Sequence, residues 1–482
     1  MPFARILRSS ALMGASQVVM MLAGFARNKL IAVFIGPGGV GLMGIMSSYN
    51  LNVSTLCGLG IGASGVRLVS SAEGEARMVK VAAVRRFGSI LAWIALVVMV
   101  ATFIPISRWT YQSPHYDQMM FVAGLAIPCV VMTTMWSALL LAAGEVKSVA
   151  KNQIVAAVLG LLLGAPLIYI YGEIGIAWSV LLAALSLAFV TWRAAAQHCP
   201  SSLPPESMPE DIRMMAKVGG AFMVGELLGQ VAVYFVRMLI LRAHGDDLKS
   251  GLADAGYYHA ALTVTGILPG FVFGAMGADF FPRVSAAKTE EDACDISEKQ
   301  IKASLLLALP GLIGILTVSK PLVVMLYASA FAPAVPLVPW FVWAIFFNLL
   351  GWPLAYWLAA RAEPGKVLTL KLLGNAVMPL SALLMIPAYG LPGAAGAYFL
   401  SSVCFAGLTV WYVRARVGRW LHGETIRWLC FAALAVLASQ WVIEISPHSV
   451  LRFFPLILAT AACGYVYMRL VRKETATKGP SP

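Results

Sequence analysis

The chain has 482 residues, of which 60% are hydrophobic and only 12% are charged. Soluble domains usually carry about 25% charged residues, so this composition excludes a soluble enzyme, a disordered chain and a collagen-like chain. The net charge of +13 reflects the Lys and Arg of cytoplasmic loops rather than a nucleic-acid surface. The sequence therefore predicts an all-α integral membrane protein, because helices satisfy their own backbone hydrogen bonds in lipid.

Apolar windows of about 20 residues, which cross a bilayer core of about 30 Å, indicate the membrane spans. Long unbroken runs such as residues 90–106 exclude the alternating pattern of a β-barrel. The first window is too long for a signal peptide and has no clear cleavage site, so we count it as a span. The fourteen predicted spans are residues 9–35, 40–63, 87–107, 119–143, 153–171, 174–192, 218–241, 256–281, 303–326, 334–360, 367–388, 392–413, 428–444 and 453–469.

The loop charges set the predicted orientation. With a cytoplasmic N-terminus, the cytoplasmic side carries 27 Lys and Arg residues and the outer loops carry four. Lys and Arg accumulate in cytoplasmic loops, and an early miscount of one span would move every later loop to the other side. The bias therefore supports both the count and cytoplasmic N- and C-termini.

A weak internal repeat relates the first six spans to the next six. Arg283 after the eighth span corresponds to Arg67 after the second, and two further pairs match at similar offsets. Because six is an even number, the repeats have the same orientation in the membrane, as in parallel-repeat transporters. We expect a six-helix lobe at 1–200, a second lobe after a cytoplasmic linker at 201–420, and two extra helices with a short tail at 421–482.

Charged residues within the spans are the strongest functional signal, since each costs at least about 2.5 kcal/mol at mid-bilayer. Arg27 and Lys29 lie in the first span and indicate an anion site, with snorkelling to the interface as the alternative. Arg237 in the seventh span either snorkels or lines a cavity. Glu226 in that span is either a protonatable coupling site or a salt-bridge partner of Arg27 or Lys29.

The second span is unusually polar. Its Asn50 and Asn52 either bind sugar hydroxyls or form interhelical hydrogen bonds. Elsewhere the six His and seven Cys are scattered, without catalytic or metal-ligand spacing, and no phosphate-binding loop of an ATPase occurs. We therefore expect neither an enzyme nor a bound cofactor or metal, and residues 36–41 predict a tight turn between two spans.

Two segments carry a family resemblance. Residues 24–42 (GFARNKLIAVFIGPGGVGL) resemble the first helix of polysaccharide flippases. Residues 278–285 (ADFFPRVS) are similar to the aspartate–aromatic–aromatic–proline–arginine pattern that ends their eighth helix, with Asp279 and Arg283 at its two charged positions. The chain thus resembles the Wzx-type flippases of O-antigen units and related glycans, in the multidrug/oligosaccharidyl-lipid/polysaccharide exporter superfamily.

The resemblance implies two six-helix lobes around a central cationic cavity. An undecaprenyl-pyrophosphate-linked oligosaccharide would pass from the cytoplasmic to the periplasmic leaflet of a bacterial inner membrane by alternating access. Membrane lipids, a polysaccharide polymerase, a chain-length regulator and a coupling H⁺ or Na⁺ are the expected partners, and nucleic acid is not. The expected substrate-binding residues are Arg27, Lys29, Arg237 and Asn52, with Glu226 for coupling or a salt bridge, and Asp279, Arg283 and Arg67 as gating or structural residues.

Two transporter alternatives stay open. Arg27 also matches a cavity arginine of lipid II flippases, but their second arginine, six residues later, is Val33 here. A multidrug antiporter for organic cations would be expected to line its cavity with acids, whereas the buried cations here outnumber the one clear buried acid, Glu226. A membrane glycosyltransferase would need a large loop or a catalytic domain, and this sequence has neither.

Overall fold

The computed structural model describes residues 3–199, 208–360, 364–419, 421–445 and 450–477. This described part is helical and contains no β-strand, which confirms the predicted all-α class. The chain divides into two compact units. The first comprises Met1–His259 and Leu326–Ala330, and the second comprises Ala260–Met325 and Phe331–Pro482, so the boundary falls inside helix α10.

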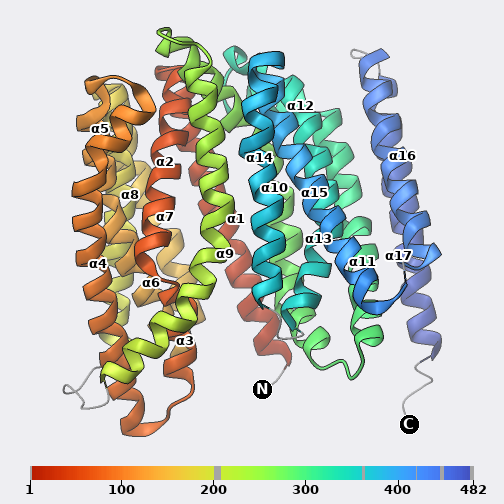
Figure 1. Ribbon diagram of the computed structural model, residues 1–482, viewed down its shortest axis with the longest axis horizontal. Helices are drawn as coiled ribbons and strands as arrows, with labels where there is room; N and C mark the ends of the chain where they lie inside the picture. Colours follow the sequence, from red (N-terminus) through yellow and green to blue (C-terminus); the bar gives the residue numbers. More distant parts are fainter. Residues whose placement is uncertain (1–2, 200–207, 361–363, 420, 446–449, 478–482) are drawn as a thin grey trace. The chain divides into compact units, whose positions relative to one another are not determined.

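The first unit is a bundle of long helices (Figure 1). In it α7 packs along both α1 and α8, and α6 packs against α4 and α8. Its elements are α1 (Phe3–Phe34), α2 (Pro37–Gly58), α3 (Ile61–Ser70), α4 (Gly74–Tyr111), η1 (Pro114–Tyr116), α5 (Asp117–Gly124), α6 (Ala126–Ala142), α7 (Val146–Tyr171), α8 (Glu173–His198), α9 (Met208–Arg242) and the start of α10 (Leu248–Ser285).

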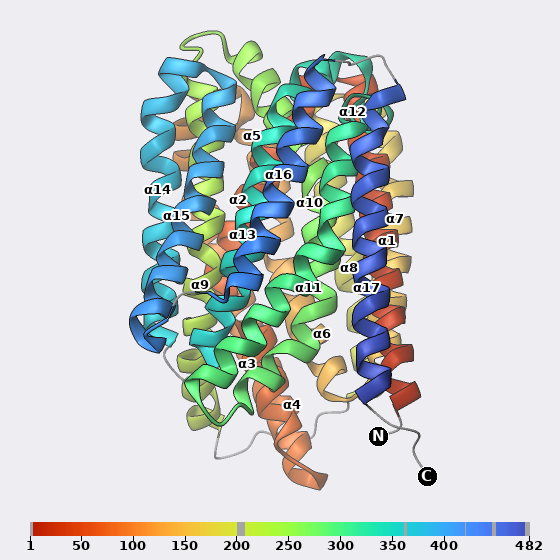
Figure 2. The ribbon, with the colours of Figure 1, turned by 90° about the vertical axis from the view of Figure 1, so that its right-hand side faces the viewer.

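The second unit holds the remaining helices. Within it α14 and α15 lie side by side, and α16 and α17 both pack on α11 (Figure 2). Its elements are the rest of α10, α11 (Glu290–Thr317), α12 (Ser319–Leu326), η2 (Ser329–Leu337), α13 (Val338–Ala360), α14 (Pro364–Tyr389), α15 (Leu391–Val417), α16 (Gly423–Ile445), η3 (Val450–Phe453) and α17 (Phe454–Thr477).

The helices match the predicted spans. Twelve helical segments of the described chain are long and apolar enough to cross a membrane. The two other predicted spans fall on α10, which has 38 residues, and on α17, whose apolar part is Phe454–Val466. The contacts place α9 in the first unit, whereas the sequence repeat assigns it to the second lobe; the lobe boundaries and the repeat stay predictions.

The second predicted span is a helix with a break. Leu59 and Gly60 have φ angles of 42° and 59°, which end α2 and start α3 in a new direction. Gly60 also lies against α9, where a Cβ atom would come within 2.3 Å of the Gly219 carbonyl oxygen. Only glycine combines this backbone conformation with so close an approach.

Helix α2 also approaches the first turns of α10 at backbone distance. A Cβ atom on Gly41 would lie 2.0 Å from the Leu252 carbonyl oxygen, and one on Gly256 would lie 2.1 Å from the Pro37 carbonyl oxygen. Small residues at such crossings let membrane helices gain close van der Waals contact without a hydrophobic driving force. The α2–α10 contact therefore depends on these two glycines.

A charged cluster ties α16 to α11 in the second unit. The buried Glu298 accepts hydrogen bonds from Arg419 at 2.8 Å, from the His422 backbone N–H at 2.8 Å and from the Thr425 hydroxyl at 2.7 Å. Arg419 also pairs with Asp295. Burial lowers the pKa of Arg419, but the hydrogen bond with Glu298 and the neighbouring acids raise it overall. Asp295, Glu298 and His422 have metal-ligand spacing, yet Arg419 already balances the two carboxylates.

We expect Gly41→Ala to separate α2 from α10, because the added methyl group overlaps the Leu252 carbonyl. The expected loss is about 1–3 kcal/mol in the free energy of unfolding, as for overpacked cores. Thermal unfolding of the purified protein in detergent measures it. Gly58→Ala on the same helix is the control, since a Cβ atom there meets nothing within 4 Å. Equal melting temperatures for the two variants would contradict the close approach.

Glu298→Ala should destabilise the attachment of α16, since it leaves Arg419 and the Thr425 hydroxyl without their buried acceptor. Arg419 is partly exposed and keeps Asp295 as a partner, so the expected loss is about 1–3 kcal/mol, as for hydrogen bonds to a charged group. Glu424→Ala removes an exposed partner of Lys302 and should cost less than about 1 kcal/mol. Thermal unfolding of both variants tests the difference, and a larger effect of Glu424→Ala would refute the role of Glu298.

Candidate functional site

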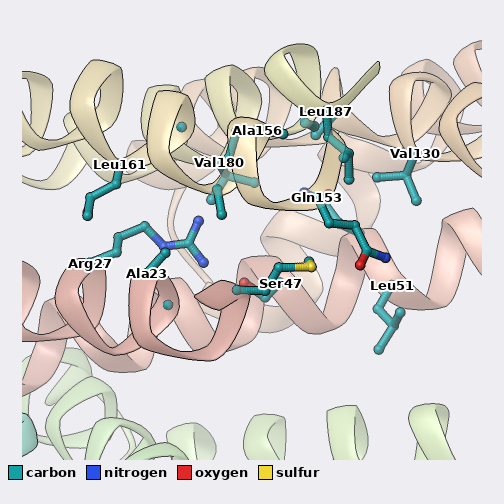
Figure 3. Close-up of a pocket in the computed structure, with 18 of the residues that line it drawn as sticks. Ala23, Arg27, Ser47, Leu51, Val130, Gln153, Ala156, Leu161, Val180 and Leu187 are labelled. Atoms are coloured by element: carbon teal, nitrogen blue, oxygen red, sulfur yellow. The ribbon is translucent and has the colours of Figure 1, made fainter. Parts of the chain in front are cut away.

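Arg27 lies near the C-terminal end of α1, seven residues before Phe34. Its side chain is partly buried, and its Nε atom is buried without a hydrogen-bond partner. No carboxylate lies within ion-pair distance of it among the described residues. The guanidinium points into a cavity of the first unit (Figure 3). A cation inside a membrane-spanning helix without a neighbouring acid has a high free-energy cost. Arg27 is therefore a candidate functional residue.

The cavity has a volume of about 350 Å³ and lies between α1, α2, α6, α7 and α8. Ala, Gly, Leu and Val form most of its wall, and no acidic or aromatic side chain lines it in the described part of the chain. Its polar groups are Arg27, Gln153 of α7, and Ser47, Asn50 and Ser54 of α2. The cavity is therefore apolar with one fixed positive charge.

Two amides in this wall are oriented by protein contacts. The Asn50 Nδ2 group donates to the Ala123 carbonyl at 2.8 Å, so the buried Oδ1 atom is left as an unpartnered acceptor. The Gln153 Oε1 atom accepts from the Ser16 hydroxyl at 2.8 Å, which leaves its NH₂ group to donate. The Ser54 hydroxyl donates to the Leu51 carbonyl of its own helix at 3.1 Å.

The second buried arginine, Arg237 of α9, is held by the protein itself. Only 6% of it is exposed. It donates to the Gly44 carbonyl at 2.5 Å and to the Ser48 hydroxyl, both on α2. Its other terminal nitrogen lies 3.0 Å from the His259 Nδ1 atom. Since a guanidinium only donates, Nδ1 accepts, and a neutral His259 carries its proton on Nε2.

His259 belongs to the environment of Arg237. Its Nδ1 atom lies 3.0 Å from the Arg237 guanidinium and connects α10 to α9. The sequence gives no signal for this role, because His259 follows Tyr257 and Tyr258 in an otherwise ordinary apolar helix. The sequence also gives no signal for Gln153, which is the first residue of a predicted span.

The other predicted site residues are more dispersed. Lys29 is partly buried and does not line the described cavity. Asn52 has a buried Oδ1 atom without a hydrogen-bond partner, and Asn50, not Asn52, lines the cavity. Glu226 is exposed and makes no ion pair with Arg27 among the described residues. Arg67 and Arg283 are exposed near the ends of α3 and α10, and the Asp279 side chain lies outside the described residues.

Solved structures with this fold are transporters by name. The chain is similar to an inward closed form of the lipid II flippase MurJ, with 13% identity, a TM-score of 0.72, and coverage of 96% of this chain and 99% of that one. It is also similar to an inward-facing multidrug resistance MATE family transporter of the MOP superfamily, with 16% identity, a TM-score of 0.67, and coverage of 85% and 98%.

A third similar structure is a MOP superfamily transporter from Pyrococcus furiosus, described as having a binding pocket of reversed polarity. It has 17% identity, a TM-score of 0.58, and coverage of 86% of this chain and 95% of that one. Fold, spans and buried charge together define a multi-pass membrane protein with the architecture of MOP superfamily flippases and exporters.

The family follows from the sequence match. The model described as polysaccharide biosynthesis protein covers residues 6–288, more than half of the chain, and the chain belongs to this family. Among curated proteins none matches the chain.

The neighbouring serines Ser47 and Ser48 allow a matched test of the Arg237 contact. Ser48→Ala removes an acceptor of a buried guanidinium and should lower the free energy of unfolding by about 1.5–3 kcal/mol. Ser47→Ala removes only a long contact to the Met43 sulfur, at 3.8 Å, and should change stability by less than about 0.5 kcal/mol. Chemical unfolding in detergent measures both, and the reverse order would contradict the described orientation of α2.

Proposed function

We propose that the protein is a flippase for an undecaprenyl-pyrophosphate-linked oligosaccharide in the bacterial inner membrane. It moves this substrate from the cytoplasmic to the periplasmic leaflet by alternating access, with both termini in the cytoplasm. The main support is Arg27, whose buried Nε atom has no hydrogen-bond partner and which lines a cavity whose described lining contains no acid. Membership of the polysaccharide biosynthesis family supports a glycan-linked substrate.

The chemistry of the proposed substrate accounts for an arginine inside the membrane. A pyrophosphate cannot cross hydrocarbon unpaired, because its ionised oxygens lose their hydration. A guanidinium offers several N–H donors in a planar fork that matches phosphate oxygens. Arg27 is suited to this contact because its buried Nε atom has no hydrogen-bond partner among the described residues, whereas the terminal nitrogens of Arg237 already contact α2 and His259. Arg237, Lys29 and Asn52 remain proposed contributors, and Arg237 adds positive potential.

The two alternatives differ in the charge and the head group of the substrate. An organic cation is repelled by a cavity with a fixed positive charge and no acid among its described lining residues, which disfavours multidrug export despite the shared fold. Lipid II carries the same pyrophosphate chemistry, so Arg27 does not separate it from other lipid-linked glycans. The family match favours a polysaccharide precursor.

The test uses a deletion strain of the source bacterium complemented with wild-type protein, Arg27→Ala, Arg27→Lys or the exposed control Arg193→Ala. Loss of charge-assisted hydrogen bonds to phosphate should slow translocation at least about tenfold in Arg27→Ala. Arg27→Lys should retain part of the rate, and Arg193→Ala should match wild type. The readouts are lipid-linked oligosaccharide in each leaflet, surface glycan and protein level in the membrane.

Three outcomes would refute the proposal. Normal surface glycan in the deletion strain with accumulated lipid II indicates a lipid II flippase. Normal glycan with increased sensitivity to cationic dyes indicates a multidrug exporter. Full translocation by Arg27→Ala at wild-type protein level removes the observation on which the proposal rests.

A further inference from the structure

The cavity beside Arg27 differs from a sugar-binding site in its size. At about 350 Å³ it lies at the lower end of ligand pockets. This volume is small for a whole oligosaccharide unit, so we expect one part of a lipid-linked glycan to occupy it. The question is which part matches its wall.

The chemistry of the wall disfavours the glycan. A sugar ring presents hydroxyls in all directions, and each hydroxyl that faces an apolar wall without a partner is disfavoured. Beside Arg27 the described lining has only four polar side chains, those of Ser47, Asn50, Ser54 and Gln153. Asn50 and Ser54 already donate to backbone carbonyls, and the Gln153 Oε1 atom already accepts from Ser16. The cavity also lacks an aromatic face among its described lining residues.

A phosphate ester with a hydrocarbon chain matches the same wall. The anionic oxygens pair with the Arg27 guanidinium, and the chain lies along Leu161, Val180 and Leu187 (Figure 3). A hydrocarbon chain has no polar group that needs a hydrogen-bond partner, and its burial is favourable. Leu51 and Val130 at the wall are 51% and 37% exposed, so the cavity communicates with the outside of the unit, from which a chain can enter.

We infer that this cavity binds the phosphate end of the lipid carrier, with the phosphate on Arg27 and the first part of the hydrocarbon chain between α1, α7 and α8, and that it excludes the glycan. The inference rests on the proposed function for the identity of the lipid. The protein would recognise its substrate in part through the lipid common to many glycans.

The test measures binding of undecaprenyl phosphate to the full-length protein in lipid nanodiscs by native mass spectrometry. Ala184→Phe and Ala157→Phe each fill the cavity from a different helix and leave Arg27 unchanged in the sequence. The matched control is Leu185→Phe, since Leu185 is the next residue on α8, is 43% exposed and does not line the cavity. Thermal unfolding verifies that each variant is folded.

The expected result is a loss of affinity of at least about tenfold in Arg27→Ala and in both cavity-filling variants, with none in Leu185→Phe. Undecaprenol, which lacks the phosphate, should bind at least about tenfold more weakly than undecaprenyl phosphate, and inorganic pyrophosphate should not compete. Phosphatidylglycerol should compete only in large excess.

Wild-type affinity in the folded cavity-filling variants would overturn the inference and leave the flippase proposal standing. Equal competition by phosphatidylglycerol would make this a general lipid-phosphate site and overturn the assignment to the carrier. Full competition by inorganic pyrophosphate would overturn the hydrocarbon part. Conversely, the predicted lipid binding together with unchanged glycan export in the deletion strain would support the lipid-phosphate site and refute the proposed flippase function.

Discussion

The structure of the first unit depends on the cost of placing a positive charge inside a membrane. A guanidinium at mid-bilayer needs hydrogen-bond acceptors, counter-charge or water. The described part of this unit supplies no carboxylate to either Arg27 or Arg237. Both charges must therefore be accommodated by dipoles, by open space or by a ligand, and the two arginines differ in which of these they use.

Arg237 is accommodated by dipoles. A backbone carbonyl, a serine hydroxyl and an imidazole nitrogen receive its protons, so the residue joins α2, α9 and α10 within one unit. The glycine contacts of α2 with α10 bring the same helices together, because they allow backbone approach. Arg27 instead lines an apolar cavity, where we propose that its charge pairs with an anion from outside the protein.

This division connects the fold with transport. The architecture is shared by flippases and multidrug exporters, so it does not by itself select a substrate. Selection comes from the sign of the charge and the polarity of the wall. The described lining has one cation, few polar side chains and many aliphatic ones, which is why we propose an amphiphilic anion, the lipid end of a lipid-linked glycan, as its ligand.

The sequence by itself determined the all-helical membrane class, the positions of the spans and the presence of costly charges at Arg27 and Arg237, because hydropathy is a local property. Only the tertiary structure decided that Arg237 donates hydrogen bonds within the protein, that Arg27 lines a cavity with its buried Nε atom unpartnered, and that Asn50 rather than Asn52 lines this cavity. These outcomes depend on partners distant in sequence, such as Gly44, 193 positions from Arg237, and Ser16, 137 positions from Gln153. Hydropathy along one helix contains no information on which side chain of another helix faces it.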